Sequence, residues 1–257
     1  MPGRADTEQP AQFLTAADGA ALAYRRQCGD APGVFFLGGF NSDMCGNKAT
    51  ALDRWCARAG RAFTRFDYRG HGESGGRLVD GTIGGWLDDA TRVLDTVAEG
   101  AQLFVGSSLG GWLALLLARR RPARCAGLLL LAPAADFTER LLPQQLGAAR
   151  LAQLAAAGAC ELPSDYPGER PYVIGEQLLR EGRSHCLLDG SPLSLPVPVR
   201  IIHGTADSSV PASESLALLD ALEGDVALTL VKNADHRLST AADTARMLRQ
   251  LEELLAR

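Results

Sequence analysis

The chain has 257 residues, of which 46% are hydrophobic and 22% are charged, and its 26 basic and 30 acidic residues leave a net charge of −4. This length suits one α/β domain with room for a modest insertion. The slightly acidic balance argues against the basic surface that binds nucleic acid or an anionic membrane.

The N-terminus and the cysteines favour a cytoplasmic protein without a metal. Residues 1–12 are polar and lack the apolar core of a signal peptide, and no segment reaches the ~18 apolar residues of a membrane helix. The six cysteines form no C-x-x-C pair, and no histidine set has zinc-ligand spacing. We therefore expect a soluble chain with free thiols, no membrane span and no bound metal.

Strand and helix patterns alternate along the chain. This rhythm predicts a mostly parallel, doubly wound sheet with helices on both faces. In the first part, strands are expected at 22–25, 34–37 and 62–67, and helices at 47–59 and 86–98. In the later part, strands are expected at 127–132, 199–203 and 226–231, and helices at 212–222 and about 240–255.

The rhythm breaks between residues 136 and 192. A Leu- and Ala-rich helical stretch covers 141–157, a Pro/Gly/Tyr-rich stretch covers 162–171, and a further helix is expected at 173–181. We interpret 136–192 as a helical lid inserted into a single domain that spans 1–257.

A serine turn lies at the centre of the chain. Residues 106–110 read Gly-Ser-Ser-Leu-Gly and fit G-x-S-x-G, with Ser108 as the nucleophile. The turn follows a strand-like stretch at 102–105 and precedes an apolar helix at 109–121, which is the context such a nucleophile turn requires. Ser107 occupies the variable position and is expected to point away.

Serine needs a base to react at neutral pH, and the chain offers four histidines. His71 lies in a glycine-rich turn, His185 lies in the expected lid, and His203 lies just inside the end of a strand, where a structural role is favoured. His236 lies in the loop 232–237 between the last strand and the last helix. In the order nucleophile, acid, histidine, this loop is the place of the base.

The carboxylate that orients the base is expected to be Asp207. It follows the strand at 199–203, between the nucleophile and His236 in chain order. Asp136, which follows the preceding strand, remains an alternative. Asp235 is adjacent to His236 and poorly placed to orient its ring.

Two backbone N–H groups are expected to stabilise the oxyanion. The first belongs to Leu109, at the N-terminal end of the helix after Ser108. The second is assigned to Phe40, because Gly38 and Gly39 let the loop approach the reacting carbonyl.

The chain resembles the serine α/β-hydrolases over nearly its whole length. Within them it is similar to the mitochondrial abhydrolase family with palmitoyl-protein thioesterase and mycophenolic acid acyl-glucuronide esterase activity. The resemblance rests on residues 39–44, 46–49, 65–68, 105–112, 185–188 and 235–237. It maps the family's catalytic triad onto Ser108, Asp207 and His236. It implies hydrolysis of acyl thioesters and acyl glucuronides, on small molecules or acyl-proteins, without a cofactor.

The expected lid supplies apolar side chains that either bind an acyl chain or only dock the lid on the core. They are Leu141, Leu142, Leu146, Leu151, Leu154 and Tyr172. A cofactor-free haloperoxidase or a carbon–carbon bond hydrolase would use the same triad, and a receptor on this fold could retain it. Serine at position 108 argues against haloalkane dehalogenase and epoxide hydrolase chemistry. The oligomeric state is left open.

Overall fold

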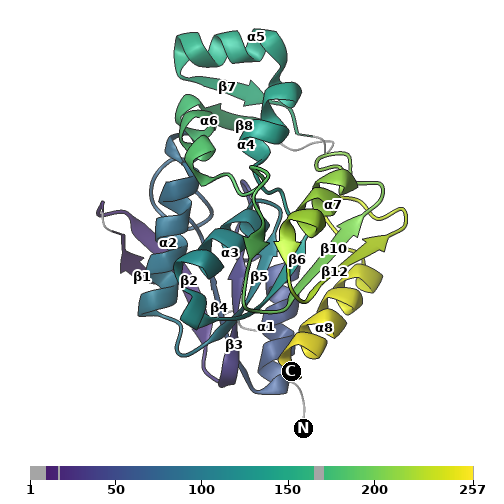
Figure 1. Ribbon diagram of the computed structural model, residues 1–257. Coiled ribbons are helices and arrows are strands. Elements are labelled where there is room, and N and C mark those ends of the chain that lie inside the picture. Colours follow the sequence, from purple (N-terminus) through teal and green to yellow (C-terminus); the bar gives the residue numbers. More distant parts are fainter. Residues whose placement is uncertain (1–9, 17, 165–170, 257) are drawn as a thin grey trace.

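An eight-stranded sheet forms the centre of the protein in the computed structural model, which describes residues 10–16, 18–164 and 171–256 (Figure 1). The spatial order is β1 (Gln12–Thr15), β2 (Ala21–Gln27), β4 (Arg61–Phe66), β3 (Asp30–Leu37), β5 (Gln102–Ser107), β6 (Cys125–Leu131), β10 (Val199–Gly204) and β12 (Val226–Val231). From β4 to β12 neighbouring strands are parallel, while β2 pairs antiparallel with β1 and with β4. The expectation of a mostly parallel sheet is confirmed.

The central strands are buried on both faces. Every residue of β5 and β10 is buried, and β6 contains the apolar run Leu128 to Leu131. Continuous rather than alternating apolar sequence is what a parallel strand needs when helices cover both sides of the sheet. This is why these strands were predictable from short hydrophobic runs.

Helices cover both faces of the sheet. On one face lie α1 (Asn47–Ala59) and α8 (Ala241–Leu255), which share an apolar cluster with Val34 and Phe36 of β3. On the other face lie α2 (Ile83–Thr96) and α3 (Leu109–Arg120), with α7 (Ala212–Ala221) beside them, around the fully buried Trp86 and Trp112. The doubly wound arrangement that the sequence predicts is confirmed.

Two helix starts have caps that sequence spacing explains. The Thr240 side chain accepts the N–H of Asp243, and the Asp243 carboxylate accepts the N–H of Thr240, which forms a capping box at the start of α8. Thr82 caps α2 by accepting the Gly85 N–H at 3.0 Å. Helix α2 therefore begins three residues before the expected start at 86.

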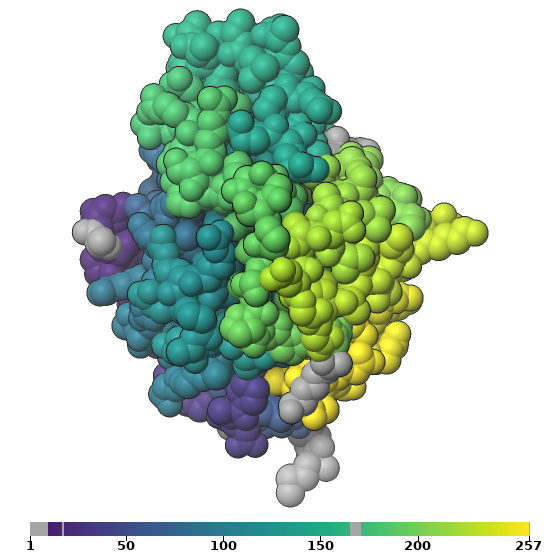
Figure 2. Space-filling model, viewed as in Figure 1, coloured from purple at the N-terminus to yellow at the C-terminus, as the bar shows by residue number. Residues whose placement is uncertain are grey.

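Between β6 and β10 the chain forms a separate group of elements above the sheet (Figure 1). They are α4 (Phe137–Arg140), α5 (Leu142–Ala157), β7 (Ala159–Leu162), β8 (Tyr172–Gly175) and α6 (Glu176–Gly182). In the space-filling view this teal and green segment projects from the body of the molecule (Figure 2). These elements lie at 137–182, within the range 136–192 that the sequence predicts to be a lid.

The predicted helix at 173–181 is wrong in its first turn. Tyr172–Gly175 is strand β8, which pairs antiparallel with β7, and the helix begins only at Glu176. Tyr, Val and Ile in sequence favour a strand, and the partner strand lies ten residues earlier. Most of the stretch at 162–171 lies outside the described residues. Local sequence patterns also did not predict the edge strand β1 or the short pair β9 (Leu193–Ser194) and β11 (Leu222–Glu223).

Within the described residues, no helix combines the length and the hydrophobicity that a membrane crossing requires.

Candidate active site

Ser108 sits in a strained turn between β5 and α3. Its φ of 55° and ψ of −118° lie in a region that non-glycine residues rarely occupy. A Cβ on Gly106 would overlap the carbonyl oxygen of Gly110, and a Cβ on Gly110 would overlap the carbonyl oxygen of Leu37. Both glycines are therefore required by packing, and together they hold the serine hydroxyl above the sheet.

The structure brings Ser108, His236 and Asp207 together. Nε2 of His236 lies 3.0 Å from Oγ of Ser108, and Nδ1 of His236 lies 2.7 Å from Oδ2 of Asp207. With the proton on Nδ1, His236 donates to the carboxylate and accepts from the serine hydroxyl, which is the arrangement of a general base. Ser107 also lines the pocket, but His236 contacts Ser108.

The Asp207 carboxylate is held in its ionised form. Burial opposes the charge, but hydrogen bonds from His203, His236 and the Val210 N–H outweigh burial and place the pKa of Asp207 well below its usual value. The Ser209 N–H donates to the same oxygen as Val210, at 3.0 Å against 2.8 Å. The carboxylate is thus a fixed negative charge beside the His236 ring.

A second histidine contacts the carboxylate from the protein interior. Nε2 of His203 lies 3.1 Å from Oδ2 of Asp207 and 2.9 Å from the carbonyl oxygen of Val210, so its N–H is shared between them. Nδ1 of His203 accepts the hydroxyl of Ser215 at 2.6 Å. The sequence favoured a structural role for His203 but missed its contact with Asp207. The signal was the four-residue spacing between a strand-end histidine and the acid.

The loop after β3 approaches Ser108. A Cβ on Gly39 would lie 3.5 Å from Cβ of Ser108, so the following residue, Phe40, is close to the nucleophile. Leu109 is the first residue of α3, and the N–H groups of a first helical turn have no acceptor within the helix. Phe40 and Leu109 therefore both lie close to Ser108, and their roles as oxyanion donors stay a prediction.

His71 supports this loop. Its Nδ1 donates to the Arg69 carbonyl at 3.2 Å, and its Nε2 accepts the N–H of Asn41, the residue after Phe40, at 3.1 Å. Burial lowers the pKa of His71 to about 4, so the ring is neutral at neutral pH and Nε2 remains an acceptor. Asn41 has a φ of 55°, a conformation that asparagine tolerates. The sequence placed His71 in a glycine-rich turn without predicting this contact.

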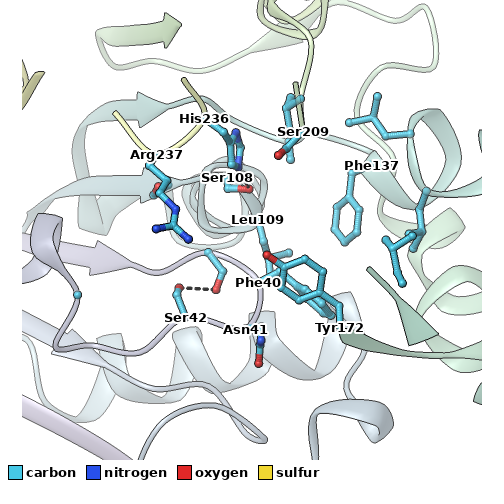
Figure 3. A pocket seen from close by; sticks show the side chains of 18 of the residues that line it. Phe40, Asn41, Ser42, Ser108, Leu109, Phe137, Tyr172, Ser209, His236 and Arg237 are labelled. Atoms are coloured by element: carbon cyan, nitrogen blue, oxygen red, sulfur yellow. Dashed lines mark hydrogen bonds between the residues drawn. The ribbon is translucent and has the colours of Figure 1, made fainter. Parts of the chain in front are cut away.

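Ser108 and His236 line a pocket of about 790 Å³. Figure 3 shows Phe137 and Tyr172 on one side of Ser108 and Arg237 on the other. The apolar side is lined by Phe40, Phe137, Leu141, Leu142, Leu162, Tyr172 and Ile174.

Three of the predicted substrate-binding residues reach this pocket. Leu141, Leu142 and Tyr172 line it, whereas Leu146 is buried in the main apolar cluster and is absent from the pocket wall. Leu151 and Leu154 also pack against or within that cluster and do not line the pocket. Phe137 was missed, because nothing in its local sequence separates it from a core aromatic residue.

The other two carboxylates that were considered have different partners. Asp136 accepts the N–H groups of Leu187 and Leu188 at 2.7 to 2.9 Å, which joins the two ends of the segment 136–192. Oδ1 of Asp235 accepts the Leu238 N–H at 3.2 Å. Across the described ranges, no three His, Cys, Asp or Glu side chains come together in a way that could hold a metal ion.

Residues 33–164 match the model of a family described as serine aminopeptidase, S33. The mitochondrial palmitoyl-protein thioesterase ABHD10 of Rattus norvegicus is 38% identical over 95% of this chain and 82% of its own length. The ABHD10 structure from mouse superposes with a TM-score of 0.87 at 38% identity, covering 96% of this chain and 99% of that one. A solved structure from Agrobacterium vitis S4 superposes with a TM-score of 0.89 at 37% identity, with 96% and 99% covered.

Proposed function

We propose that this chain cleaves acyl esters and acyl thioesters through an acyl-enzyme on Ser108. The chain belongs to the α/β-hydrolase family that includes ABHD10 and that is described by the serine aminopeptidase S33 model. Membership makes the chain an ester or thioester hydrolase. The substrates would be those of an acyl-protein thioesterase or an acyl-glucuronide esterase.

The hydrogen-bonded series from Asp207 through His236 to Ser108 carries the proposal, because it ends at the wall of the large pocket. Nε2 of His236 takes the proton from Oγ of Ser108 as that oxygen attacks the acyl carbonyl carbon. The N–H groups of Phe40 and Leu109 then stabilise the negative carbonyl oxygen. His236 returns the proton to the leaving alcohol or thiol, and a water molecule releases the acid by the same steps.

The projecting segment would act as a lid that supplies the acyl site. Phe137 and Tyr172 lie at ring-centroid distances of 6.4 and 5.8 Å from Phe40, so aromatic rings from the segment and from the oxyanion loop form one apolar wall. Such a wall excludes water from the oxyanion and buries an acyl chain. Each buried CH₂ contributes ~0.8 kcal/mol, which is a several-fold gain in kcat/KM until the site is full.

A chain-length series tests the proposal. We expect kcat/KM to rise from acetyl to at least hexanoyl p-nitrophenyl esters, and we expect acyl thioesters to be cleaved as well. Tyr172→Ala should flatten the series, while Ser108→Ala should abolish it. A flat or falling series without thioester turnover would remove the acyl site and leave a small-ester hydrolase or a non-acyl activity.

A further inference from the structure

The pocket wall contains more positive than negative side chains. Among its described lining residues, the charged side chains besides His236 are Lys48, Arg150 and Arg237, opposed by the single carboxylate of Asp43. Figure 3 places Arg237 beside His236 and Ser108, across from Phe137 and Tyr172. We call Lys48, Arg237 and the first turn of α1 the basic end of the pocket.

Lys48 is the central group of the basic end. Its side chain is half-buried on the pocket wall, and within the described parts of the chain it has no hydrogen bond or ion pair. Burial lowers the pKa of Lys48 to about 8, with Asp235 acting against this effect and Arg237 adding to it. A partly desolvated ammonium group is costly unless a negative group pairs with it directly.

The first turn of α1 adds to the positive potential. Gly46, Asn47, Lys48 and Ala49 all line the pocket, no side chain caps the helix, and its first turn contains no acidic residue. The N–H groups of such a turn have no acceptor within the helix, and the helix dipole places partial positive charge there. The positive charge of a lysine in this turn is repelled by the positive end of the helix dipole. A bound anion would offset that repulsion.

The nearby carboxylates are engaged elsewhere. Asp43 accepts the Cys45 N–H at 2.8 Å, and Asp243 caps α8 and pairs with Arg246 at 3.2 Å. Asp235 accepts the Leu238 N–H, and Asp207 accepts from His236. Asp235, Asp243 and Asp207 favour the charged form of Lys48 from a distance, and within the described chain none of the four acids forms an ion pair with it.

We propose that the basic end binds an anionic group, a carboxylate or a phosphate, carried by the leaving group of the substrate. The assignment to the leaving group follows from His236: its Nε2 must reach the leaving atom to return the proton, and Arg237 is the next residue in the chain. The acyl chain then occupies the apolar side. This inference rests on the proposed function, since it specifies which ester or thioester is preferred.

Matched thioesters test it. The octanoyl thioesters of 3-mercaptopropionate and 6-mercaptohexanoate are compared with those of the corresponding neutral amides, and octanoyl-coenzyme A is compared with octanoyl-pantetheine. We expect the wild-type protein to prefer at least one anionic partner by 5-fold or more in kcat/KM. The two carboxylate spacings and the phosphate-bearing thiol distinguish which anion fits.

Three variants locate the effect. Lys48→Met should reduce the preference to below 2-fold, and Lys48→Arg should retain it. Lys232→Met, which changes the other lysine of the chain at an exposed site off the pocket wall, should leave it unchanged. The preference is a ratio measured on one preparation, so a variant that folds less well still gives a valid value.

Two results would overturn the inference. One is equal kcat/KM for every anionic and neutral pair in a wild-type protein that turns over the neutral thioesters. The other is a preference that survives in Lys48→Met. Absence of turnover for all thioesters and esters would instead overturn the proposed function itself, and this inference with it.

Discussion

The side chains of His203 and Asp207 are completely buried and in contact, with Nε2 of His203 3.1 Å from Oδ2 of Asp207. Asp207 therefore has a histidine on each side: His236 faces the pocket, and His203 fixes the carboxylate from the interior. The carboxylate is thus held from the interior and contacts the His236 ring, whose Nε2 lies 3.0 Å from Oγ of Ser108.

We predict that His203 is a positioning residue. His203→Asn should lower kcat by roughly 10–100-fold while KM changes less than 2-fold, because the carboxylate loses a donor that fixes its orientation. Ser215→Ala, which removes the hydroxyl on the other ring nitrogen, should lower kcat less. A lower melting temperature with unchanged kcat would show that His203 serves the fold alone.

Only one of the two adjacent serines should react. Ser108→Ala should abolish labelling by a fluorophosphonate and lower kcat by roughly 10⁴-fold or more, because His236 contacts Ser108. Ser107→Ala should still be labelled, although Ser107 also lies on the pocket wall. Labelling that disappears only in the Ser107 variant would reverse the assignment.

Substitution of Asp207 should affect activity, whereas substitution of Asp136 should affect stability. Asp207→Asn should keep the fold and lower kcat by roughly 10⁴-fold, because an amide cannot orient the ring or balance its charge. Asp136→Asn should leave kcat nearly unchanged but destabilise the protein by about 1–3 kcal/mol, because one of two buried N–H groups loses its acceptor. Urea denaturation and steady-state kinetics measure both. A larger kcat loss in the Asp136 variant would move the acid to that position.

His71 should make stability depend on pH in a defined window. In the unfolded chain it binds a proton below its ordinary pKa of 6.5, whereas in the folded protein burial lowers that pKa to about 4. The unfolded state thus binds more protons between these values, so stability is complete above pH 6.5 and falls as the pH drops towards 4. The contribution lost is about 3 kcal/mol.

Urea titrations at pH 7.5, 5.5 and 4.5 measure this loss. The variant His71→Gln keeps an acceptor for the Asn41 N–H but does not titrate, so its stability should fall less steeply over the same window. The carboxylates are common to both proteins and cancel in the comparison. Parallel slopes would show that another group titrates.

The sequence predicted the parts of the fold that depend on local pattern. The strands β3, β5, β6 and β10 appear as short apolar runs because both faces of the sheet are covered there, and residues 47–59 coincide with α1. The strand Tyr172–Gly175 was missed because its identity depends on pairing with β7, which a window of neighbouring residues does not contain.

In the candidate site, too, local pattern predicted some residues, while contacts made by tertiary packing were missed. Chain order and turn chemistry were enough to select Ser108, Asp207 and His236, which the structure brings within hydrogen-bonding distance. The contact of His71 with Asn41 and that of His203 with Asp207 join side chains to partners defined by tertiary packing. Residue type alone could not separate pocket leucines from core leucines. Leu146 is a leucine like Leu141 and Leu142, but it is buried in the core and does not line the pocket.

The close approach of Gly110 to the end of β3 determines which parts of the protein can change in sequence without moving Ser108. Because the Gly110 backbone rests on the carbonyl groups of Leu37 and Gly38, the nucleophile turn and the loop that leads to Phe40 share one reference point within the sheet. Their relative position does not depend on the segment between β6 and β10. Side chains of that segment can therefore change while the spacing between the Ser108 hydroxyl and the loop that leads to Phe40 stays the same.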